Sequence, residues 1–376
     1  MNELRSAFQH LASEGVQGLE PYEPGKPMAE LQREYGLSEV IKLASNENPR
    51  GPAPAAVAAA REAAAEVHRY PDGNGYGLKQ ALAIHHGVAP ETITLGNGSN
   101  DVLALVASTF LEPGREAVFS EHAFAVYPIV TAASGATARV APALGPETAM
   151  PYGHDLAAMA GLVGERTRVV FVANPNNPTG TWVTRDALKE FLRGLPDHVI
   201  AVVDEAYCEY ADDPAMPNAT EWLSAFPNLV VTRTFSKVHG LAGLRAGYSI
   251  AHPAVAELFN RVRQPFNMSA CAQAAAEAAI GDPDYVRASV ALNNEQREWL
   301  RERLVAMGLT VLPSAGNFLC VHVGDATGVN EGLLRQGVIV RPVAGYGLPE
   351  WVRVSVGLPE ENERFLEALA PLVDTA

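Results

Sequence analysis

The first two thirds of the chain alternate short apolar runs with segments of helix-forming composition. Residues 168–173, 199–203 and 229–232 are rich in valine, as expected of strands buried on both faces. Residues 185–192, between the first two runs, follow a helical pattern. Continuous apolar strands separated by helices are typical of a mainly parallel sheet with helices on both faces. The pattern therefore predicts an α/β fold.

The same alternation predicts the elements on either side of these strands. Towards the N-terminus we expect helices at 55–67 and 127–133 and strands at 93–95 and 117–119. Towards the C-terminus, helices at 254–263 and 270–280 precede a long charged helix at 285–307. The remaining elements predict a smaller α/β unit, with strands at 309–312, 318–323, 338–340 and 352–356 and helices at 328–336 and 360–372.

Three domains or segments follow from this organisation. Residues 1–40 are expected to form an arm that joins the small domain and covers the active site, because Pro21, Pro24 and Pro27 disfavour a helix between them. Residues 41–280 are expected to form the large domain and residues 281–376 the small C-terminal α/β domain. A chain of 376 residues is long enough for two cores.

Charge and cysteine content exclude several classes of function. The formal net charge of -15 argues against binding to a nucleic-acid backbone. Cys208, Cys271 and Cys320 have neither metal-site spacing nor an even disulfide framework, so we expect reduced thiols and no metal. The N-terminus lacks the apolar core of a signal peptide, and no apolar run reaches membrane-spanning length. The expected location is cytoplasmic.

Polar residues follow three of the predicted strands at their carboxyl ends. Asn177 comes after the strand at 168–173, Asp204 closes the next, and Lys237 follows the third. Ligands of open α/β sheets bind beyond the carboxyl ends of the strands, so these side chains are expected to face one crevice. Each also has an ordinary alternative: a helix cap for Asp204, a turn for Asn177, and a solvated surface position for Lys237.

Together these residues fit the requirements of pyridoxal phosphate (PLP). A lysine at the exit of a buried strand loses solvation, which lowers its pKa and frees its lone pair to form an imine. Asp204 is suited to pair with the pyridine nitrogen, and Tyr207 and Asn177 to contact the ring oxygen. The residues suited to hold the phosphate are the helix start at Ser99 and Asn100 together with Thr234, Ser236 and Arg245.

The motifs resemble those of fold type I PLP enzymes, the aspartate aminotransferase-like group. They are Asn177-Pro178-Thr179-Gly180, Asp204-Glu205-Ala206-Tyr207, Thr234-Phe235-Ser236-Lys237 and Gly243-Leu244-Arg245. Three further stretches resemble the histidinol-phosphate aminotransferase family: Asn46-Glu47-Asn48-Pro49, Arg69-Tyr70-Pro71-Asp72-Gly73 and Arg353-Val354-Ser355-Val356-Gly357. Residues 21–27 and 341–347 also match this family, and they resemble a branch of it associated with aromatic amino-acid synthesis. The resemblance extends from about residue 21 to about residue 368. It implies a large PLP-binding domain with a mainly parallel sheet between helices.

The resemblance also implies a role for each matching residue. Lys237 would form the Schiff base, and Asp204 and Tyr207 would complete the catalytic set. Phe124 would stack on the cofactor ring, although His122-Ala123-Phe124 departs from the family's usual Pro-Thr-aromatic pattern, so Tyr127 is the alternative. Tyr70 would reach the cofactor phosphate from a neighbouring subunit, which implies a homodimer with shared active sites. The cofactor contacts implied in this way are Asn177, Asp204, Tyr207, Ser99, Asn100, Phe124, Thr234, Ser236, Lys237, Arg245 and Tyr70.

The implied activity is the ping-pong transamination of histidinol phosphate with 2-oxoglutarate, in histidine biosynthesis. Arg353 would bind a substrate carboxylate, and Arg341, Tyr22 and Asn46 would join it around the substrate. The alternatives are an aminotransferase for phenylalanine or tyrosine and, in another class, a PLP decarboxylase of the threonine-phosphate type. A regulator with this fold would normally carry an attached DNA-binding domain, for which the chain has neither spare length nor a basic patch.

Overall fold

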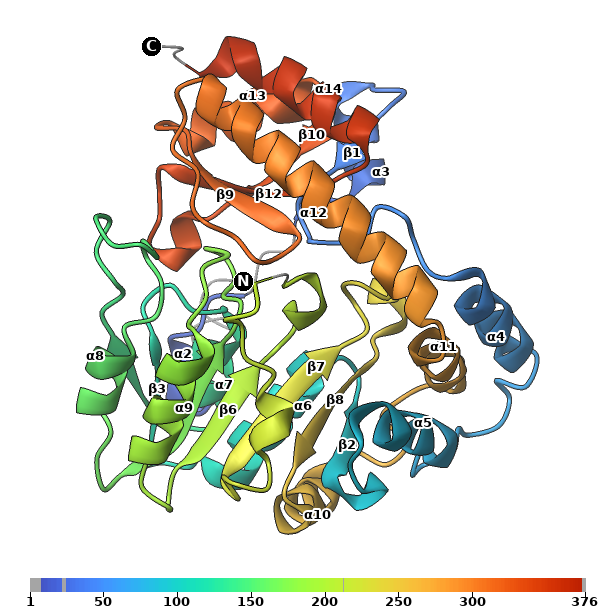
Figure 1. Ribbon diagram of the computed structural model, residues 1–376, viewed down its shortest axis with the longest axis vertical. Coiled ribbons are helices and arrows are strands. Elements are labelled where there is room, and N and C mark those ends of the chain that lie inside the picture. Colours follow the sequence, from blue (N-terminus) through green and yellow to red (C-terminus); the bar gives the residue numbers. More distant parts are fainter. Residues whose placement is uncertain (1–7, 22–24, 212, 374–376) are drawn as a thin grey trace.

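A seven-stranded sheet forms the centre of the larger part of the molecule (Figure 1). The computed structural model describes residues 8–21, 25–211 and 213–373. The strand order is β2-β8-β7-β6-β5-β3-β4, in which β7, β6, β5, β3 and β4 are parallel. The fold is therefore α/β with a mainly parallel sheet, as predicted. The strands are β2 (Ile93–Gly96), β3 (Glu116–Ser120), β4 (Thr137–Ala141), β5 (Thr167–Ala173), β6 (Ile200–Asp204), β7 (Leu229–Thr234) and β8 (Gly247–Ala251).

Both faces of this sheet are buried, which explains the uninterrupted valine runs. In β5, Phe171 packs in a cluster with helices α6, α7 and α10, whereas its neighbours Val170 and Val172 pack in a cluster with α8 and α9 on the opposite face. Helices α4, α5 and α11 pack together beside β2 and β8. These helices are α4 (Pro54–Ala64), α5 (Tyr76–His86), α6 (Ser99–Phe110), α7 (Val126–Ala133), α8 (Leu156–Gly161), α9 (Arg185–Gly194), α10 (Pro253–Val262) and α11 (Ala270–Ile280).

Two strands of the sheet were not predicted. Strand β4 is the edge strand and has mostly exposed or half-exposed residues, so it lacks the apolar run of its neighbours. Strand β8 is fully buried but short, and its glycine and serine interrupt the apolar pattern that predicts a buried strand. Strand β8 pairs antiparallel with both β7 and β2. It therefore lies between the parallel strands and the edge strand β2.

A smaller layer lies above the edge of the large sheet (Figure 1). Its three-stranded antiparallel sheet has the order β11-β12-β9, and β1 pairs in parallel with β10 beside it. A buried cluster joins these strands to the long helix α12 and to α13 and α14. The elements are β1 (Ile41–Lys42), β9 (Phe318–His322), β10 (Val338–Ile339), β11 (Arg341–Pro342), β12 (Trp351–Ser355), α12 (Pro283–Ala306), α13 (Ala326–Arg335) and α14 (Pro359–Leu369).

Two details differ from the sequence prediction for this layer. Residues 309–312 form no regular strand, because their pairing is limited to an isolated bridge between Val311 and Val321. Strand β1, expected within the large domain, pairs with β10 of the smaller layer. The chain therefore contributes β1 to the small layer before it enters the large sheet. The pairing of β1 with β10 joins residues that are far apart in sequence.

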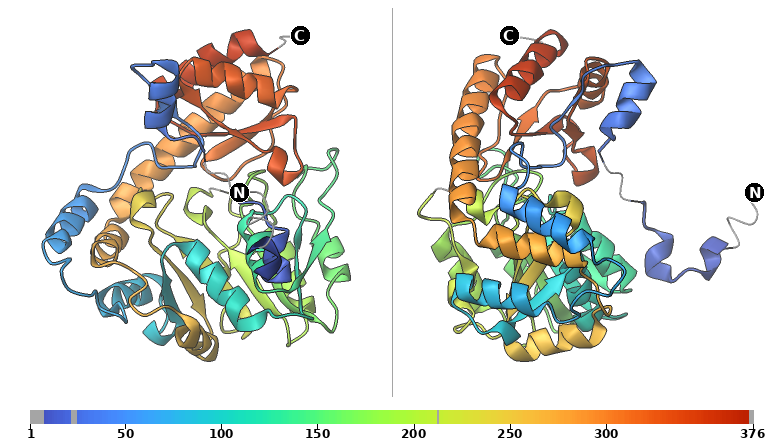
Figure 2. Two further views of the ribbon diagram at one scale, coloured as in Figure 1. Left: turned by 180° about the vertical axis from the view of Figure 1, so that it is seen from behind. Right: turned by 90° about the vertical axis from the view of Figure 1, so that its right-hand side faces the viewer.

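The N-terminal arm contains helices that the sequence analysis did not predict. Helix α2 (Glu14–Gln17) contacts α7, and α3 (Met28–Tyr35) begins directly after Pro27, where a proline suits a helix start. Leu31 of α3 is buried against Val40 and Ile339, which attaches this part of the arm to the small layer. Figure 2 shows the segment with α2 extending from the body of the molecule.

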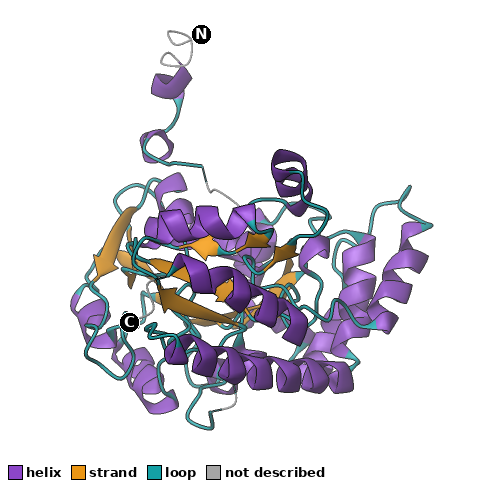
Figure 3. Cartoon of the chain, turned by 90° about the horizontal axis from the view of Figure 1, so that it is seen from above, coloured by secondary structure: helices purple, strands orange, loops and turns teal. Residues whose placement is uncertain are grey.

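Helices surround the strands when the molecule is seen from above (Figure 3). No helix within the described residues has the length and apolar character needed to cross a membrane. Both layers contribute to one cavity, which is lined by Lys237 from the large layer and by Arg341 and Arg353 from the small layer.

Candidate active site

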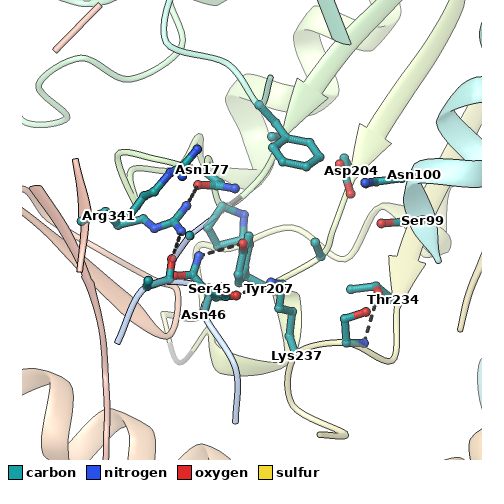
Figure 4. Close-up of a pocket in the computed structure, with 18 of the residues that line it drawn as sticks. Ser45, Asn46, Ser99, Asn100, Asn177, Asp204, Tyr207, Thr234, Lys237 and Arg341 are labelled. Carbon is teal, nitrogen blue, oxygen red and sulfur yellow. Dashed lines mark hydrogen bonds between the residues drawn. The ribbon is translucent and has the colours of Figure 1, made fainter. Parts of the chain in front are cut away.

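A cavity of about 170 Å³ lies at the carboxyl edge of the large sheet, beneath the small layer. Figure 4 shows Lys237 and Tyr207 between two groups of side chains: Asp204, Asn100, Ser99 and Thr234 on one side, and Asn177 and Arg341 on the other. Thirteen of the residues predicted for the site line this cavity. They are Asn46, Ser99, Asn100, Phe124, Asn177, Asp204, Tyr207, Thr234, Ser236, Lys237, Arg245, Arg341 and Arg353.

Lys237 lies in the turn that follows β7, and its side chain points into the cavity (Figure 4). Its Nζ donates a hydrogen bond to the backbone oxygen of Ser45 at 3.1 Å. Burial, and next the positive charge of Arg353, lower the pKa of Lys237 from its ordinary 10.5 to about 7. A large fraction of this amine is therefore neutral and nucleophilic near pH 7.

Asp204 ends β6 and is held by two hydroxyl groups. Tyr127 Oη donates to Asp204 Oδ2 at 2.9 Å, and Thr232 Oγ1 donates to Oδ1 at 3.0 Å. Burial raises the pKa of Asp204, while these two hydrogen bonds lower it. Among the described residues, hydroxyls rather than a cation contact the carboxylate. The cavity therefore presents a buried acid that is suited to a cationic partner from a ligand.

The roles of Tyr127 and Thr232 were missed by the sequence analysis. Thr232 is the register partner of Asp204 on the neighbouring parallel strand, so the pairing of β6 with β7 places its hydroxyl there. Tyr127 lies on α7, three residues after Phe124, which precedes the helix, and the ring centroids of Tyr127 and Phe171 are 4.7 Å apart. It does not line the cavity, whereas Phe124 does.

An anion site is formed where the start of α6 meets Arg245. Gly98 precedes the helix with φ +82°, and a Cβ there would lie 2.6 Å from Arg245 Nη2. Glycine at this position therefore permits the guanidinium to approach the unpaired N–H groups of the helix start. Arg245 Nη1 also donates to Ser236 Oγ at 3.3 Å, and the Ser236 N–H donates to Thr234 Oγ1 at 3.1 Å. These donors converge on one wall of the cavity.

Arg353 lies in the opposite wall, on β12. Its Nη1 donates to Asn177 Oδ1 at 2.5 Å and its Nη2 donates to the backbone oxygen of Ala44 at 2.5 Å. Within the described residues, its buried Nε has no hydrogen-bond partner. The antiparallel register of β11 and β12 places Arg341 directly beside Arg353. This wall of the cavity therefore contains two adjacent arginines, a pair suited to an anionic group.

Tyr207 occupies the middle of the cavity floor. Asn46 Nδ2 donates to its hydroxyl oxygen at 3.0 Å, and Lys237 Nζ lies 5.4 Å from the centroid of its ring. Burial raises the pKa of Tyr207, while Arg353 and the hydrogen bond from Asn46 lower it. The phenol therefore stays protonated at neutral pH and can serve as a donor.

The chain matches the family described as aminotransferase class I and II over residues 38–369. It is 55% identical to histidinol-phosphate aminotransferase 2 of Pseudomonas fluorescens, with 96% of this chain and 97% of the relative aligned. It is 54% identical to the protein of the same name from Methylococcus capsulatus, with 96% and 97% aligned. The chain belongs to the histidinol-phosphate aminotransferase family.

Solved structures agree with this assignment to the histidinol-phosphate aminotransferase family. The enzyme of that name from Sinorhizobium meliloti, in complex with pyridoxal 5′-phosphate, superposes with a TM-score of 0.87 at 32% identity, covering 96% of this chain and 97% of that one. Aspartate aminotransferase of Thermus thermophilus, with maleate, has a TM-score of 0.81 at 22% identity and covers 96% and 99%. The second likeness shows the shared fold alone.

The cofactor of this aminotransferase family is pyridoxal 5′-phosphate, and the cavity fits it. A lysine with a pKa near 7, a buried carboxylate without its own cation, and an anion site meet the needs of the aldehyde, the ring nitrogen and the phosphate, respectively. Of the predicted site residues that the structure describes, Tyr70 lies elsewhere. Tyr70 is 82% exposed and stacks on Phe266 outside the cavity, and Tyr22 lies outside the described residues.

Proposed function

We propose that this protein transfers the amino group of histidinol phosphate to 2-oxoglutarate by a ping-pong mechanism, as a step in histidine biosynthesis. The names of the relatives at 54–55% identity support this substrate. The observation that carries the proposal within the chain is the pair of adjacent arginines, Arg341 and Arg353, across the cavity from Lys237. The pair suits two anions that must bind in turn, the phosphate of the donor and the carboxylates of the acceptor.

Lys237 is proposed to attach the cofactor covalently and to move the reacting proton. When bound, PLP withdraws electrons from the carbon that bears the amino group, so that the proton on this carbon becomes acidic. With the cofactor and substrate bound, Lys237 Nζ would accept that proton as a base and give it back as an acid on the cofactor side of the amine nitrogen. A pKa of about 7 suits an amine that must both accept and donate a proton near neutral pH.

The other residues of the cavity hold and tune the cofactor. When PLP is bound, Asp204 would pair with the protonated ring nitrogen, Tyr207 and Asn177 would contact the ring oxygen, and Phe124 would cover one face of the ring. Tyr127 and Thr232 keep the Asp204 carboxylate oriented through their hydroxyls. The cofactor phosphate is held at the anion site, which consists of Ser99, Asn100, Thr234, Ser236 and Arg245.

Arg353 is proposed to orient the substrate as well as to bind it. In the structure its guanidinium already donates to Asn177 and Ala44, so its plane is fixed before a carboxylate arrives. With a carboxylate substrate such as glutamate, Arg353 would hold the carboxylate in a fixed orientation and would so favour loss of the proton from the amino-bearing carbon over loss of CO2. Arg341 and Tyr22 are proposed to join Arg353 around the phosphate of histidinol phosphate, and Asn46 to lie beside the substrate.

The substrate assignment is tested by comparing amino donors. We expect kcat/KM for histidinol phosphate with 2-oxoglutarate to exceed that for phenylalanine or tyrosine by at least about 100-fold. The reason is that histidinol phosphate brings a phosphate to the adjacent arginines, whereas phenylalanine and tyrosine bring a single carboxylate with less charge. Initial rates of glutamate formation provide the measurement. A higher kcat/KM for phenylalanine or tyrosine would contradict the proposed donor, and stoichiometric CO2 without an oxo product would contradict transamination itself.

The pKa of Lys237 predicts how the apoprotein takes up its cofactor. The bimolecular rate of covalent loading should rise about tenfold per pH unit below pH 7 and level off above it, because the reactive neutral amine increases up to its pKa of about 7. Stopped-flow absorbance between pH 5 and 9 measures this rate. In Arg353→Ala, which removes a positive charge that lowers this pKa, the plateau should begin at higher pH. A rate that climbs steadily to pH 9 in the unmodified protein would contradict the lowered pKa.

We further propose a homodimer in which Tyr70 of one subunit completes the site of the other. The proposal is supported by the exposure of Tyr70 and its neighbour Phe266, two aromatic side chains stacked on the surface.

The chain is proposed to divide at about residues 40 and 280 into an N-terminal arm, a large domain and a small domain. It is proposed to work in the cytoplasm, where its three free cysteines stay reduced.

Shared sites predict complementation between two defective subunits. Hybrid dimers of Lys237→Ala and Tyr70→Ala chains contain one site with both residues intact. After unfolding and refolding together, the mixture should recover up to about a quarter of wild-type activity, because half of the dimers are hybrids with one intact site of two. Refolding each variant separately is the control. Recovery no greater than the average of the two separate variants would contradict the shared site.

A further inference from the structure

Asn46 has a backbone conformation that few residue types adopt, at a fully enclosed position. Its φ is +54°, in the left-handed region, and it is 1% exposed. Asparagine tolerates this region better than most residues other than glycine. The conformation is held from both sides, since the Asn46 N–H donates to Ser355 Oγ at 2.8 Å and Asn317 Nδ2 donates to the Asn46 backbone oxygen at 3.0 Å.

Ser355 determines which way the Asn46 amide faces. A serine hydroxyl has one proton, and because Ser355 Oγ accepts the Asn46 N–H, that proton is free to be donated elsewhere. It is donated to Asn46 Oδ1 at 3.1 Å. The carbonyl end of the amide therefore faces Ser355, and Nδ2 faces Tyr207 at 3.0 Å. The opposite orientation would leave the Ser355 proton facing an NH2 group.

This orientation constrains the proton of Tyr207. Because the Tyr207 oxygen accepts from Asn46, its own proton must point away from that residue. Among the described residues, the charged or titratable side chains that interact with Tyr207 are Asp204, Lys237, Arg353, Tyr127 and Tyr210. Asp204 already accepts hydrogen bonds from Tyr127 and Thr232. Lys237 Nζ donates to the backbone oxygen of Ser45, and Arg353 donates to Asn177. The open direction for the Tyr207 proton is the cavity.

We propose that Asn46, locked by Ser355, is a positioning residue that directs the hydroxyl proton of Tyr207 into the cavity, towards the ring oxygen of the cofactor. This inference rests on the proposed function, in which Tyr207 contacts that oxygen. It gives Asn46 a role towards Tyr207 that is distinct from contact with the substrate. Ser355 also lies two residues after Arg353 on β12. The strand that carries the proposed substrate-binding arginine therefore also carries the serine that fixes the Asn46 amide.

The test changes the group that faces the Tyr207 hydroxyl while it preserves the backbone conformation at position 46. Asparagine 46 is replaced by aspartate and, separately, by glycine, both of which are compatible with φ +54°. In Asn46→Asp a carboxylate oxygen faces Tyr207 and accepts its proton, so the ring oxygen of the cofactor loses its donor. In Asn46→Gly the hydroxyl is released but can still donate to the cofactor.

The readout is the pH at which the visible absorption of the bound cofactor changes. A donor to the ring oxygen stabilises its negative charge, so withdrawing the donor should raise this spectroscopic pKa, by about one unit for one hydrogen bond. We expect this shift in Asn46→Asp, with PLP affinity about tenfold lower in titrations of the apoprotein. Asn46→Gly should shift the pKa by less than half as much, and Ser355→Ala by an intermediate amount.

A double-mutant cycle separates positioning from the direct field of the new carboxylate. In a Tyr207→Phe background, Asn46→Asp should change the spectroscopic pKa by less than a third of its effect in the wild type, because the effect passes through the Tyr207 hydroxyl. An equal shift in both backgrounds, equal shifts for Asn46→Asp and Asn46→Gly, or no shift in Asn46→Asp would each overturn the inference. A wild-type protein that binds no PLP would instead overturn the proposed function, so the two failures are distinguishable.

Discussion

Replacing Lys237 with alanine is expected to abolish covalent attachment of the cofactor and to lower kcat by at least about a thousandfold, the scale seen when a covalent catalytic group is removed. Lys237 is the lysine that lines the described cavity, and its amine is proposed to carry both the attachment and the proton transfer. Sodium borohydride reduction followed by intact-mass measurement tests attachment directly. The wild-type protein should gain the mass of the reduced cofactor, and Lys237→Ala should not.

A matched variant controls for the general loss of a lysine. Lys189 lies on α9, with its Nζ 5.8 Å from the ring centroid of Trp222, and does not line the cavity. Lys189→Ala should therefore retain both the mass gain and the turnover. Phosphate contacts at the anion site are independent of Lys237, so the Lys237→Ala protein should still bind PLP reversibly. Covalent attachment at full stoichiometry in Lys237→Ala would mean that another residue holds the cofactor.

Replacing Arg353 with alanine should have the second largest effect. We expect kcat/KM for glutamate to fall by the equivalent of about 2–4 kcal/mol, the cost of removing one member of a buried charged pair. This corresponds to a factor of about 30 to 1000. Arg353→Lys should recover only part of the loss, because an ammonium group cannot reproduce the planar, two-pronged contact of a guanidinium with a carboxylate. Steady-state kinetics with glutamate and with histidinol phosphate measure both variants.

Two controls isolate the substrate contact from cofactor binding. Arg353 also donates to Asn177 and Ala44, so the affinity for PLP must be measured in each variant alongside the kinetics. Arg335 is an exposed arginine of α13 and does not line the cavity, and Arg335→Ala should leave kcat/KM within a factor of about two, as is usual for surface substitutions. An unchanged kcat/KM for glutamate in Arg353→Ala would refute the role of this residue.

The convergence of the site residues could be predicted because it depends on local pattern and on one property of parallel sheets. Asn177, Asp204 and Lys237 each follow a recognisable apolar strand, and parallel strands bring their carboxyl ends to one edge. Long, well-defined helices were predicted equally well: α11 covers residues 270–280 as expected. Edge strand β4 and the short strand β8 were not predicted, because their positions are determined by neighbours rather than by their own hydrophobic pattern.

The contacts that orient the catalytic groups could not be predicted in the same way. Tyr127 reaches Asp204 across 77 positions of sequence, and Arg353 reaches Asn177 across 176. No local pattern marks such a pair, because it depends on how α7 packs on the sheet and on how the small layer closes over it. The lowered pKa of Lys237 has the same origin, since burial and the charge of a distant arginine produce it together.

The sequence by itself determined the α/β class, the family, the cofactor and the main residues around it, because periodicity and motif order are properties of neighbouring positions. Only the tertiary structure decided how those residues are oriented. The lock of Ser355 on Asn46 joins residues 309 positions apart, and the direction of the Tyr207 proton depends on it. Hydrogen bonds require donor and acceptor within about 3 Å, so this information exists only once the two layers have folded against each other.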